Sequence, residues 1–248
     1  MRLLADCGNT SVKLALAEGR TVQAFARLKA DPAQLSAAIY EHAGAIEELV
    51  LLPGNWRNSD VVRTWWAGVC CDLPVRTIGD EILLPVVGQY PGMGVDRIVA
   101  GIAACVLERQ PVLVVDAGTA TTIGAWYHDG RSEPPAGCRF LGGLILPAAR
   151  TCLAGLAAMA PALPLVEPLG PGSSAAQRST VAAIGAAMGI GYGPMVAACL
   201  IKLSRETGIR TTVFTGGNVD LLVDSQVAHR DRVREQLTMD GLAWLAER

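Results

Sequence analysis

The sequence has few histidines and aromatic residues, no paired cysteine motif and no excess of positive charge. It holds only 3 histidines, and its 7 cysteines include no Cys-x-x-Cys pair, so neither a structural zinc site nor a disulfide framework is expected. Aromatic residues make up 5% and the formal net charge is −2, without a basic stripe, which argues against nucleic acid as a partner. The chain also lacks low-complexity tracts and is 51% hydrophobic. It is therefore expected to be ordered, and its cysteines fit a reducing cytoplasm.

Signals for transport to or through a membrane are weak. The apolar run before Asp6 is too short for a signal peptide. Residues 181–201 carry no charge and are long enough for a membrane-spanning helix. Several glycines and Pro194 interrupt this stretch, which is typical of small residues pressed into a soluble core, with a helix break near residues 191–194. No membrane association is expected.

A phrase that occurs twice is the most informative feature present. Asp6-Cys7-Gly8-Asn9-Thr10 follows one apolar run, and Asp116-Ala117-Gly118-Thr119 follows another; we call residues 6–13 and 116–122 the first and second Asp-Gly loops. Each copy is typical of a buried strand, a glycine turn and a returning strand. Because glycine admits a ligand close to the backbone and turn amides can hold phosphate oxygens, the pair predicts two similar halves facing one cleft. Two ordinary β-hairpins are the alternative.

The hydrophobic pattern predicts a similar order of elements in each half. In the first half, strands are expected at residues 2–5, 12–17, 22–28, 49–52 and 75–78, and helices at 32–45, 61–68 and 98–107. In the second, strands are expected at 112–115, 121–127, 138–141, 144–146 and 211–214, and helices at 148–159, 179–188 and 195–207. This pattern favours two α/β domains, residues 1–111 and 112–248, hinged on a cleft.

Five motifs, taken in order, resemble those of the type III pantothenate kinases, which belong to the acetate kinase, sugar kinase, heat-shock ATPase and actin superfamily. They are Asp6-x-Gly-Asn-Thr, Gly94-Val-Asp96-Arg97, Asp116-x-Gly-Thr119, Gly142-Gly143-x-Ile145-x-Pro147 and Thr215-Gly216-Gly217. The Gly-x-Asp-Arg element is specific to the family, whereas the first and last motifs occur across the superfamily. The resemblance implies an α/β fold of duplicated actin-like ATPase (ribonuclease H-like) domains, each a mixed sheet with flanking helices, with a cleft between them.

The resemblance also implies how ATP is bound. Backbone amides and Thr10 would contact the terminal phosphates, Lys13 would add positive charge, and Asp6 would orient Mg²⁺ or water. The first Asp-Gly loop would supply Asp6, Cys7, Gly8, Asn9, Thr10, Ser11, Val12 and Lys13 as ATP-binding residues. On the residues alone, an ordinary outward-facing charge is an equal alternative for Lys13.

The second half would complete the nucleotide site. The resemblance implies that Thr119 contacts ATP and that Asp116 helps to bind a monovalent cation, K⁺ or NH₄⁺, which would offset the crowded negative charge. It also implies that Thr215, Gly216 and Gly217 make room for the adenosine. A simple tight turn is the alternative for this last motif.

Asp96 is the expected catalytic residue. Phosphoryl transfer to an alcohol needs a group that aligns the hydroxyl with the γ-phosphorus and takes up its proton. A carboxylate at the start of a buried helix can do both, although a helix cap is the structural alternative. By resemblance, the pantothenate contacts are Tyr90, Gly94, Val95, Asp96, Arg97 and Thr180. The Arg97 fork suits the pantothenate carboxylate, and a helix N-cap is the alternative for Thr180.

Two positions depart from the family pattern. The loop before Gly94 is one residue shorter than usual and lacks an asparagine, which bears on the placement of Tyr90. Ala148 follows Pro147 where the family has a glycine, a residue that would permit a positive φ.

Together these features predict a cytoplasmic homodimer that phosphorylates pantothenate with ATP, the first step towards coenzyme A. The alternatives are another small-molecule kinase of the superfamily, acting on a sugar or amino sugar, and a non-catalytic nucleotide-binding regulator.

Overall fold

A computed structural model describes the backbone of residues 1–248 and all side chains except those of Ala24 and Phe25. The chain divides into two compact units. The first comprises Met1–Leu107, Glu133–Ala136 and Gln236–Arg248, and the second comprises Glu108–Ser132 and Gly137–Glu235. The C-terminal segment thus lies in the first unit, whereas the sequence pattern placed it in the second half. Each unit is described by itself below.

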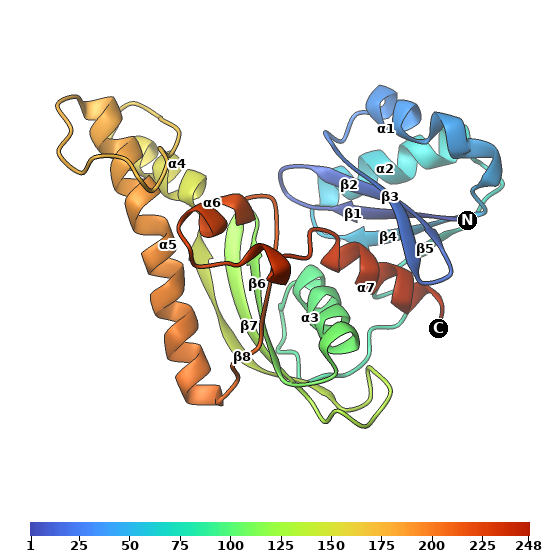
Figure 1. Ribbon diagram of the computed structural model, residues 1–248. Coiled ribbons are helices and arrows are strands. Elements are labelled where there is room, and N and C mark those ends of the chain that lie inside the picture. Colours follow the sequence, from blue (N-terminus) through green and yellow to red (C-terminus); the bar gives the residue numbers. More distant parts are fainter. The chain divides into compact units, whose positions relative to one another are not determined.

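The sheet of the first unit has the strand order β3-β2-β1-β4-β5 (Figure 1). Its strands are β1 (Arg2–Cys7), β2 (Val12–Glu18), β3 (Thr21–Leu28), β4 (Glu48–Pro53) and β5 (Val75–Thr77). β1 is antiparallel to β2 and parallel to β4, and the meander of three strands was predicted. Because β1 and β4 are central strands covered on both faces, they form nearly continuous apolar runs.

Helices cover both faces of this sheet (Figure 1). The helices in contact with its strands are α1 (Pro32–Ile39), α2 (Trp56–Val69) and α7 (Leu237–Ala246). The 3₁₀ helix η1 (Tyr40–Ala45) follows α1, and α3 (Val95–Glu108) lies against α7. α1 begins at the predicted residue, Pro32, and Asp31 is its N-cap. It passes into a 3₁₀ helix after Ile39, within the helix predicted over residues 32–45. In α7 every residue but Asp240 is buried, and Gly241 lies against the backbone of Val99 in α3. This burial explains why the C-terminal segment belongs to the first unit.

The second unit repeats the central arrangement of the first. Its sheet has the order β8-β7-β6-β9, and β6 is antiparallel to β7 and parallel to β9, just as β1 relates to β2 and β4. The elements are β6 (Val112–Ala117), β7 (Ala120–His128), β8 (Cys138–Pro147), α4 (Ala149–Met159), α5 (Thr180–Thr207), β9 (Thr212–Thr215), α6 (Val219–Asp224) and the 3₁₀ helix η2 (Arg230–Arg232). The two strands predicted at 138–141 and 144–146 are one strand. Its register shifts between Gly142, which pairs with Ala125, and Phe140, which pairs with Trp126.

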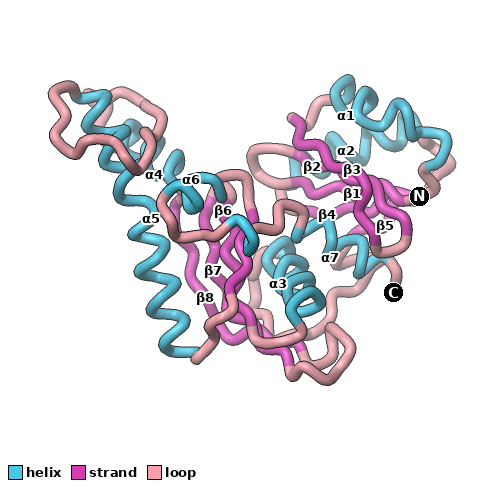
Figure 2. Tube along the Cα trace, in the orientation of Figure 1, coloured by secondary structure: helices cyan, strands magenta, loops and turns pink.

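The helix break predicted near residues 191–194 is wrong. α5 runs without interruption from Thr180 to Thr207, although Pro194 lies inside it (Figure 2). A proline removes one helical hydrogen bond, but the helix continues through it. Earlier in α5, the amide of Leu169 donates to the carbonyl of Gly185 at 2.9 Å, so the segment around Leu169 lies against the helix. By length and composition α5 is able to cross a membrane, but a core helix of a soluble protein passes the same test.

Candidate active site

The first Asp-Gly loop joins β1 to β2 and centres on a buried carboxylate. Asp6 is only 4% exposed, and the antiparallel register places Lys13 directly opposite it. Lys13 Nζ donates to Asp6 Oδ2 at 2.7 Å, so Lys13 is not an outward-facing solvated charge. The pair compensates the buried carboxylate and holds both groups at the mouth of the loop.

Cys7, the residue between Asp6 and Gly8, is a structural residue of this loop. Its side chain is fully buried, and burial raises the pKa of the thiol to about 12. The thiol is therefore neutral at physiological pH, and Cys7 contributes backbone groups rather than nucleophilic chemistry.

The second Asp-Gly loop joins β6 to β7 and lies directly against the turn after β9. Asp116 pairs in register with Thr215, which is buried. A Cβ on Gly216 would lie 2.4 Å from Asp116 Oδ1, and Gly216 has a φ of +98°, so glycine is required there. The turn therefore packs directly against the second Asp-Gly loop. Thr119 is exposed, and its carbonyl accepts a hydrogen bond from Thr151 Oγ1 at 2.6 Å.

Two of the predicted substrate contacts, Tyr90 and Arg97, come together at the start of α3. Tyr90 is 46% exposed, and its hydroxyl accepts a hydrogen bond from Arg97 Nη1 at 2.7 Å. The Arg97 guanidinium also lies 6.0 Å from the centre of the Tyr90 ring. Gly92, with a φ of +81°, makes the turn that brings Tyr90 back towards the helix. The shortened loop therefore still places Tyr90 beside Arg97.

Asp96 lies in the first turn of α3 and is exposed. Its Oδ1 accepts a hydrogen bond from the backbone N–H of Arg97 at 2.8 Å. A Cβ on Gly94 would lie 2.5 Å from this same oxygen, so the glycine of the Gly-x-Asp-Arg element leaves room for the carboxylate. The start of α3 thus fixes the position of Oδ1.

The structure shows which residue caps α5 and which backbone conformation Ala148 adopts. Ser179, not Thr180, is the N-cap of α5, because its Oγ accepts a hydrogen bond from the N–H of Ala182 at 3.2 Å. The cap interpretation of Thr180 is therefore wrong, and Thr180 is an exposed first residue of the helix. Ala148 has φ −72° and ψ 167°, an extended conformation that needs no glycine.

The predicted Mg²⁺ and the predicted K⁺ or NH₄⁺ ion each depend on a single carboxylate, Asp6 and Asp116 respectively. Among the described residues, no group of three His, Cys, Asp or Glu side chains could by itself hold a metal ion. Mg²⁺ in phosphotransferases is usually held by one or two carboxylates with the substrate phosphates, so Asp6 fits this requirement. Asp116, the other predicted cation ligand, lies close to two glycines: a Cβ would come within 3.6 Å of its Oδ1 at Gly118 and within 2.4 Å at Gly216.

Comparison with known proteins identifies the family. Residues 2–201 match the model of the type III pantothenate kinases. The chain belongs to this family. It is 28% identical to the type III pantothenate kinase of Moorella thermoacetica over 265 residues, which covers 100% of this chain and 99% of the relative. It is 31% identical to that of Desulfovibrio desulfuricans, covering 87% and 85% of the two chains.

Solved structures confirm the fold. A putative 2-dehydro-3-deoxygalactonokinase from Sinorhizobium meliloti is similar, with a TM-score of 0.58 and 15% identity, over 99% of this chain and 96% of that protein. With the two mixed sheets and their flanking helices, this confirms the predicted α/β fold of duplicated actin-like ATPase domains. The chain is a member of a kinase family, and the predicted enzyme class is therefore confirmed.

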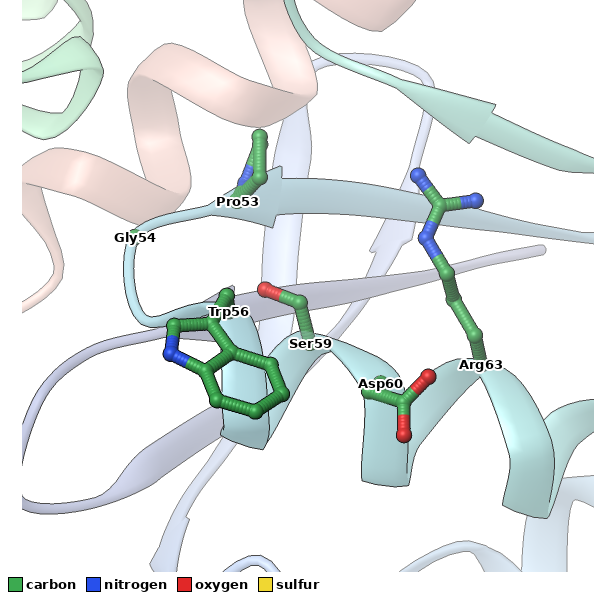
Figure 3. A pocket seen from close by; sticks show the side chains of 6 residues that line it. All are labelled: Pro53, Gly54, Trp56, Ser59, Asp60 and Arg63. Atoms are coloured by element: carbon green, nitrogen blue, oxygen red, sulfur yellow. The ribbon is translucent and has the colours of Figure 1, made fainter.

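A pocket of about 360 Å³ in this kinase contains none of the predicted site residues. Figure 3 shows Trp56, Ser59, Asp60 and Arg63 along one side of α2, with Pro53 and Gly54 at the end of β4. Its polar groups are largely paired inside the unit: Ser59 Oγ donates to the Asn55 carbonyl at 2.9 Å, and Arg63 Nη2 donates to Thr77 Oγ1 at 2.6 Å. We assign the pocket no part in nucleotide or substrate binding.

Three asparagines that contact the two Asp-Gly loops were not predicted from the sequence. They are Asn55, Asn58 and Asn218. Asn55 and Asn58 donate hydrogen bonds to the first loop, and Asn218 to the second. Asn218 directly follows the Thr215-Gly216-Gly217 motif, which was the one available signal for it. Asn55 and Asn58 lie in no motif of the family resemblance.

Proposed function

We propose that this kinase transfers the γ-phosphoryl group of ATP to the primary alcohol of pantothenate, giving 4′-phosphopantothenate in the first step of coenzyme A biosynthesis. The observation that carries the proposal is the cluster at the start of α3, where Asp96 is followed by an Arg97 that pairs with Tyr90. A carboxylate and a guanidinium on successive residues suit a substrate that carries both a hydroxyl and a carboxylate. Family membership supports the choice of pantothenate.

Asp96 is the proposed general base. The pantothenate hydroxyl oxygen attacks the γ-phosphorus, the bond from that phosphorus to the bridging oxygen of ADP breaks, and the hydroxyl proton passes to the carboxylate. Asp96 Oδ1 is oriented by the Arg97 N–H, which leaves Oδ2 as the proton acceptor. Tyr90, Gly94, Val95, Arg97 and Thr180 are the proposed contacts of pantothenate.

The two Asp-Gly loops are the proposed binding sites for the phosphates of ATP. In the first loop, Asp6 would hold Mg²⁺ and Lys13 would offset negative charge, while residues 7–12 contact the phosphates through their backbone and Thr10. In the second, Thr119 would contact ATP and Asp116 a K⁺ or NH₄⁺ ion. The motif Thr215-Gly216-Gly217 would receive the adenosine. A bound Mg²⁺ supplies charge neutralisation for the transferred phosphoryl group.

Arg97 tests the substrate assignment. Arg97→Lys keeps the positive charge but loses the two-pronged geometry that binds a carboxylate. We expect KM for pantothenate to rise about tenfold, equivalent to one charged hydrogen bond, with KM for ATP unchanged. Arg57→Lys, on an exposed part of α2, is the matched control and should change neither constant. Equal KM values for pantothenate in Arg97→Lys and wild type would remove Arg97 from the carboxylate site.

The proposed activity itself is tested with the purified protein, ATP, Mg²⁺ and pantothenate, with and without K⁺. We expect phosphorylated pantothenate to form, and its rate to fall when K⁺ is replaced by Na⁺. Sugars and amino sugars in place of pantothenate should give no product. Turnover of a sugar but not of pantothenate would instead support the second kinase assignment.

A cytoplasmic homodimer is part of this proposal. Large apolar side chains of the second unit are exposed on β8, α4 and α5, as a subunit interface would require. They include Ile145, Leu156, Met159, Val181 and Ile201. The mass of the active preparation in solution should correspond to two chains.

A further inference from the structure

The two Asp-Gly loops are held in the same way by the turn that follows the neighbouring parallel strand. After β4, the backbone N–H of Asn55 donates to the carbonyl of Cys7 at 2.6 Å. After β9, the backbone N–H of Asn218 donates to the carbonyl of Ala117 at 2.8 Å. Cys7 and Ala117 occupy the same position in the repeated Asp-x-Gly phrase, so each unit contains an equivalent bond.

An asparagine side chain adds a second, matching bond in each unit. Asn58 Nδ2 donates to the carbonyl of Gly8 at 2.6 Å, and Asn218 Nδ2 donates to the carbonyl of Gly118 at 2.7 Å. Both asparagines are half-buried. Two successive carbonyls of each loop are therefore fixed by donors that follow the neighbouring parallel strand: Asn55 and Asn58 at the start of α2 in the first unit, and Asn218 in the second.

A glycine brings each turn close enough for these bonds. A Cβ on Gly54 would lie 2.7 Å from the Cys7 carbonyl oxygen, and a Cβ on Gly216 would lie 2.5 Å from the Ala117 carbonyl carbon. Any larger residue at either position would push the turn away from the loop. The close approach of backbone to backbone is thus built into both units.

These bonds determine where the loop amides point. In a trans peptide the C=O and the following N–H point in opposite directions. Because the Gly8 carbonyl points to Asn58, the N–H of Asn9 points away from α2. For the same reason, the N–H of Thr119 points away from Asn218. These two N–H groups follow the Asp-x-Gly phrase, where turn amides can bind phosphate oxygens.

We propose that Asn58 and Asn218 are positioning residues that orient the Asn9 and Thr119 amides towards the phosphates of ATP, an inference that rests on the nucleotide sites proposed above. Neither side chain is used to cap a helix. α2 is capped by Asn55, whose Oδ1 accepts from the N–H groups of Arg57 and Asn58. Asn218 is at the N-cap position of α6 but makes no capping bond with its side chain. Both amides serve the loops.

Alanine variants measure this positioning role. Asn58→Ala and Asn218→Ala should each raise KM and Kd for ATP about tenfold, the effect of losing one hydrogen bond that orients a ligand donor. KM for pantothenate should stay the same. Because each loop is held within its own unit, the effects should multiply to about a hundredfold in the double variant. Arg57→Ala and Asp220→Ala, neighbours that contact neither loop, are the controls and should bind ATP as the wild type does.

An isosteric variant separates positioning from helix stability. Aspartate is as good an N-cap as asparagine, but its carboxylate cannot donate to the Gly118 carbonyl. Asn218→Asp should therefore remain folded, with the helix content of the wild type by circular dichroism, because Asn218 makes no capping bond in α6. It should still bind ATP at least tenfold more weakly, in 0.5 M as in 0.1 M salt, whereas simple charge repulsion would be screened. Wild-type ATP affinity in Asn218→Asp, or alanine variants that lose stability without losing affinity, would overturn the proposal.

The affinity of the asparagine variants for ATP or a non-hydrolysable analogue can be measured by titration calorimetry. This measurement does not depend on the proposed activity towards pantothenate. If the wild type binds the analogue but does not turn over pantothenate, the assignment of the substrate is wrong, and the asparagine variants still test the positioning role. If the wild type binds no nucleotide, both proposals fail.

Discussion

Replacement of Asp96 by asparagine is expected to lower kcat for pantothenate by about 10²- to 10⁴-fold, the usual contribution of a positioned general base. The amide oxygen of the new side chain can still accept the N–H of Arg97, so the start of α3 should keep its conformation. The substituted side chain can align the hydroxyl but cannot take its proton. KM for pantothenate should therefore change little, and initial rates at saturating ATP measure both constants.

The matched control is Asp31→Asn, an isosteric change of a carboxylate at the start of another helix of the same unit. Asp31 Oδ1 accepts the N–H of Gln34 as the N-cap of α1, and asparagine caps a helix equally well. Its kcat should equal that of the wild type. An Asp96→Asn variant that retains wild-type kcat would show that proton transfer does not depend on this carboxylate.

Two glycines in α5 are expected to respond in opposite ways to alanine. A Cβ on Gly189 would lie 1.9 Å from the carbonyl oxygen of Leu169, whereas a Cβ on Gly191 would meet no atom within 4 Å. Gly189→Ala must push the backbone near Leu169 off the helix, and we expect the free energy of unfolding to fall by about 1–3 kcal/mol. Gly191→Ala should raise it by about 0.5–1 kcal/mol, because alanine is the better helix former.

Urea unfolding followed by circular dichroism measures both changes, and the paired variants share one helix and one chemical substitution. The difference between them therefore reports the contact with Leu169 rather than helix propensity. Equal effects of the two substitutions would mean that the segment around Leu169 does not rest on α5.

The sequence predicted best what is determined locally. The Asp-x-Gly phrases, the returning strands and the helix that starts near Asp96 all depend on residues adjacent in the chain, and the structure has each of them. The break predicted in α5 was wrong because Pro194 and its glycines were weighed by local propensity alone. The segment packed against Gly185 and Gly189 comes from a Pro- and Gly-rich link with no periodicity to reveal it.

Contacts in the candidate site between residues far apart in the chain could not be predicted from the sequence either. The motifs located Asp6, Asp96 and Asp116, since each lies in a short pattern. Asn58 lies fifty residues from the glycine whose carbonyl it binds, and only the parallel pairing of β1 with β4 brings them together. The Asp6–Lys13 bond could be predicted in part. The register of the antiparallel hairpin, which places the two residues opposite each other, follows from the sequence, but the contact between their side chains does not.

The burial of α7 in the first unit has a consequence for biosynthesis. A chain made from its N-terminus finishes the strands and helices of the second unit before Leu237 leaves the ribosome, so that unit can close its core during translation. The first unit has to wait, because Leu242, Trp244 and their neighbours belong to its interior. Arg2, near the beginning of the chain, bonds to Glu247, near its end, so the last-made helix is fastened to the first-made strand. The interior of the first unit is thus complete only once α7 has been made.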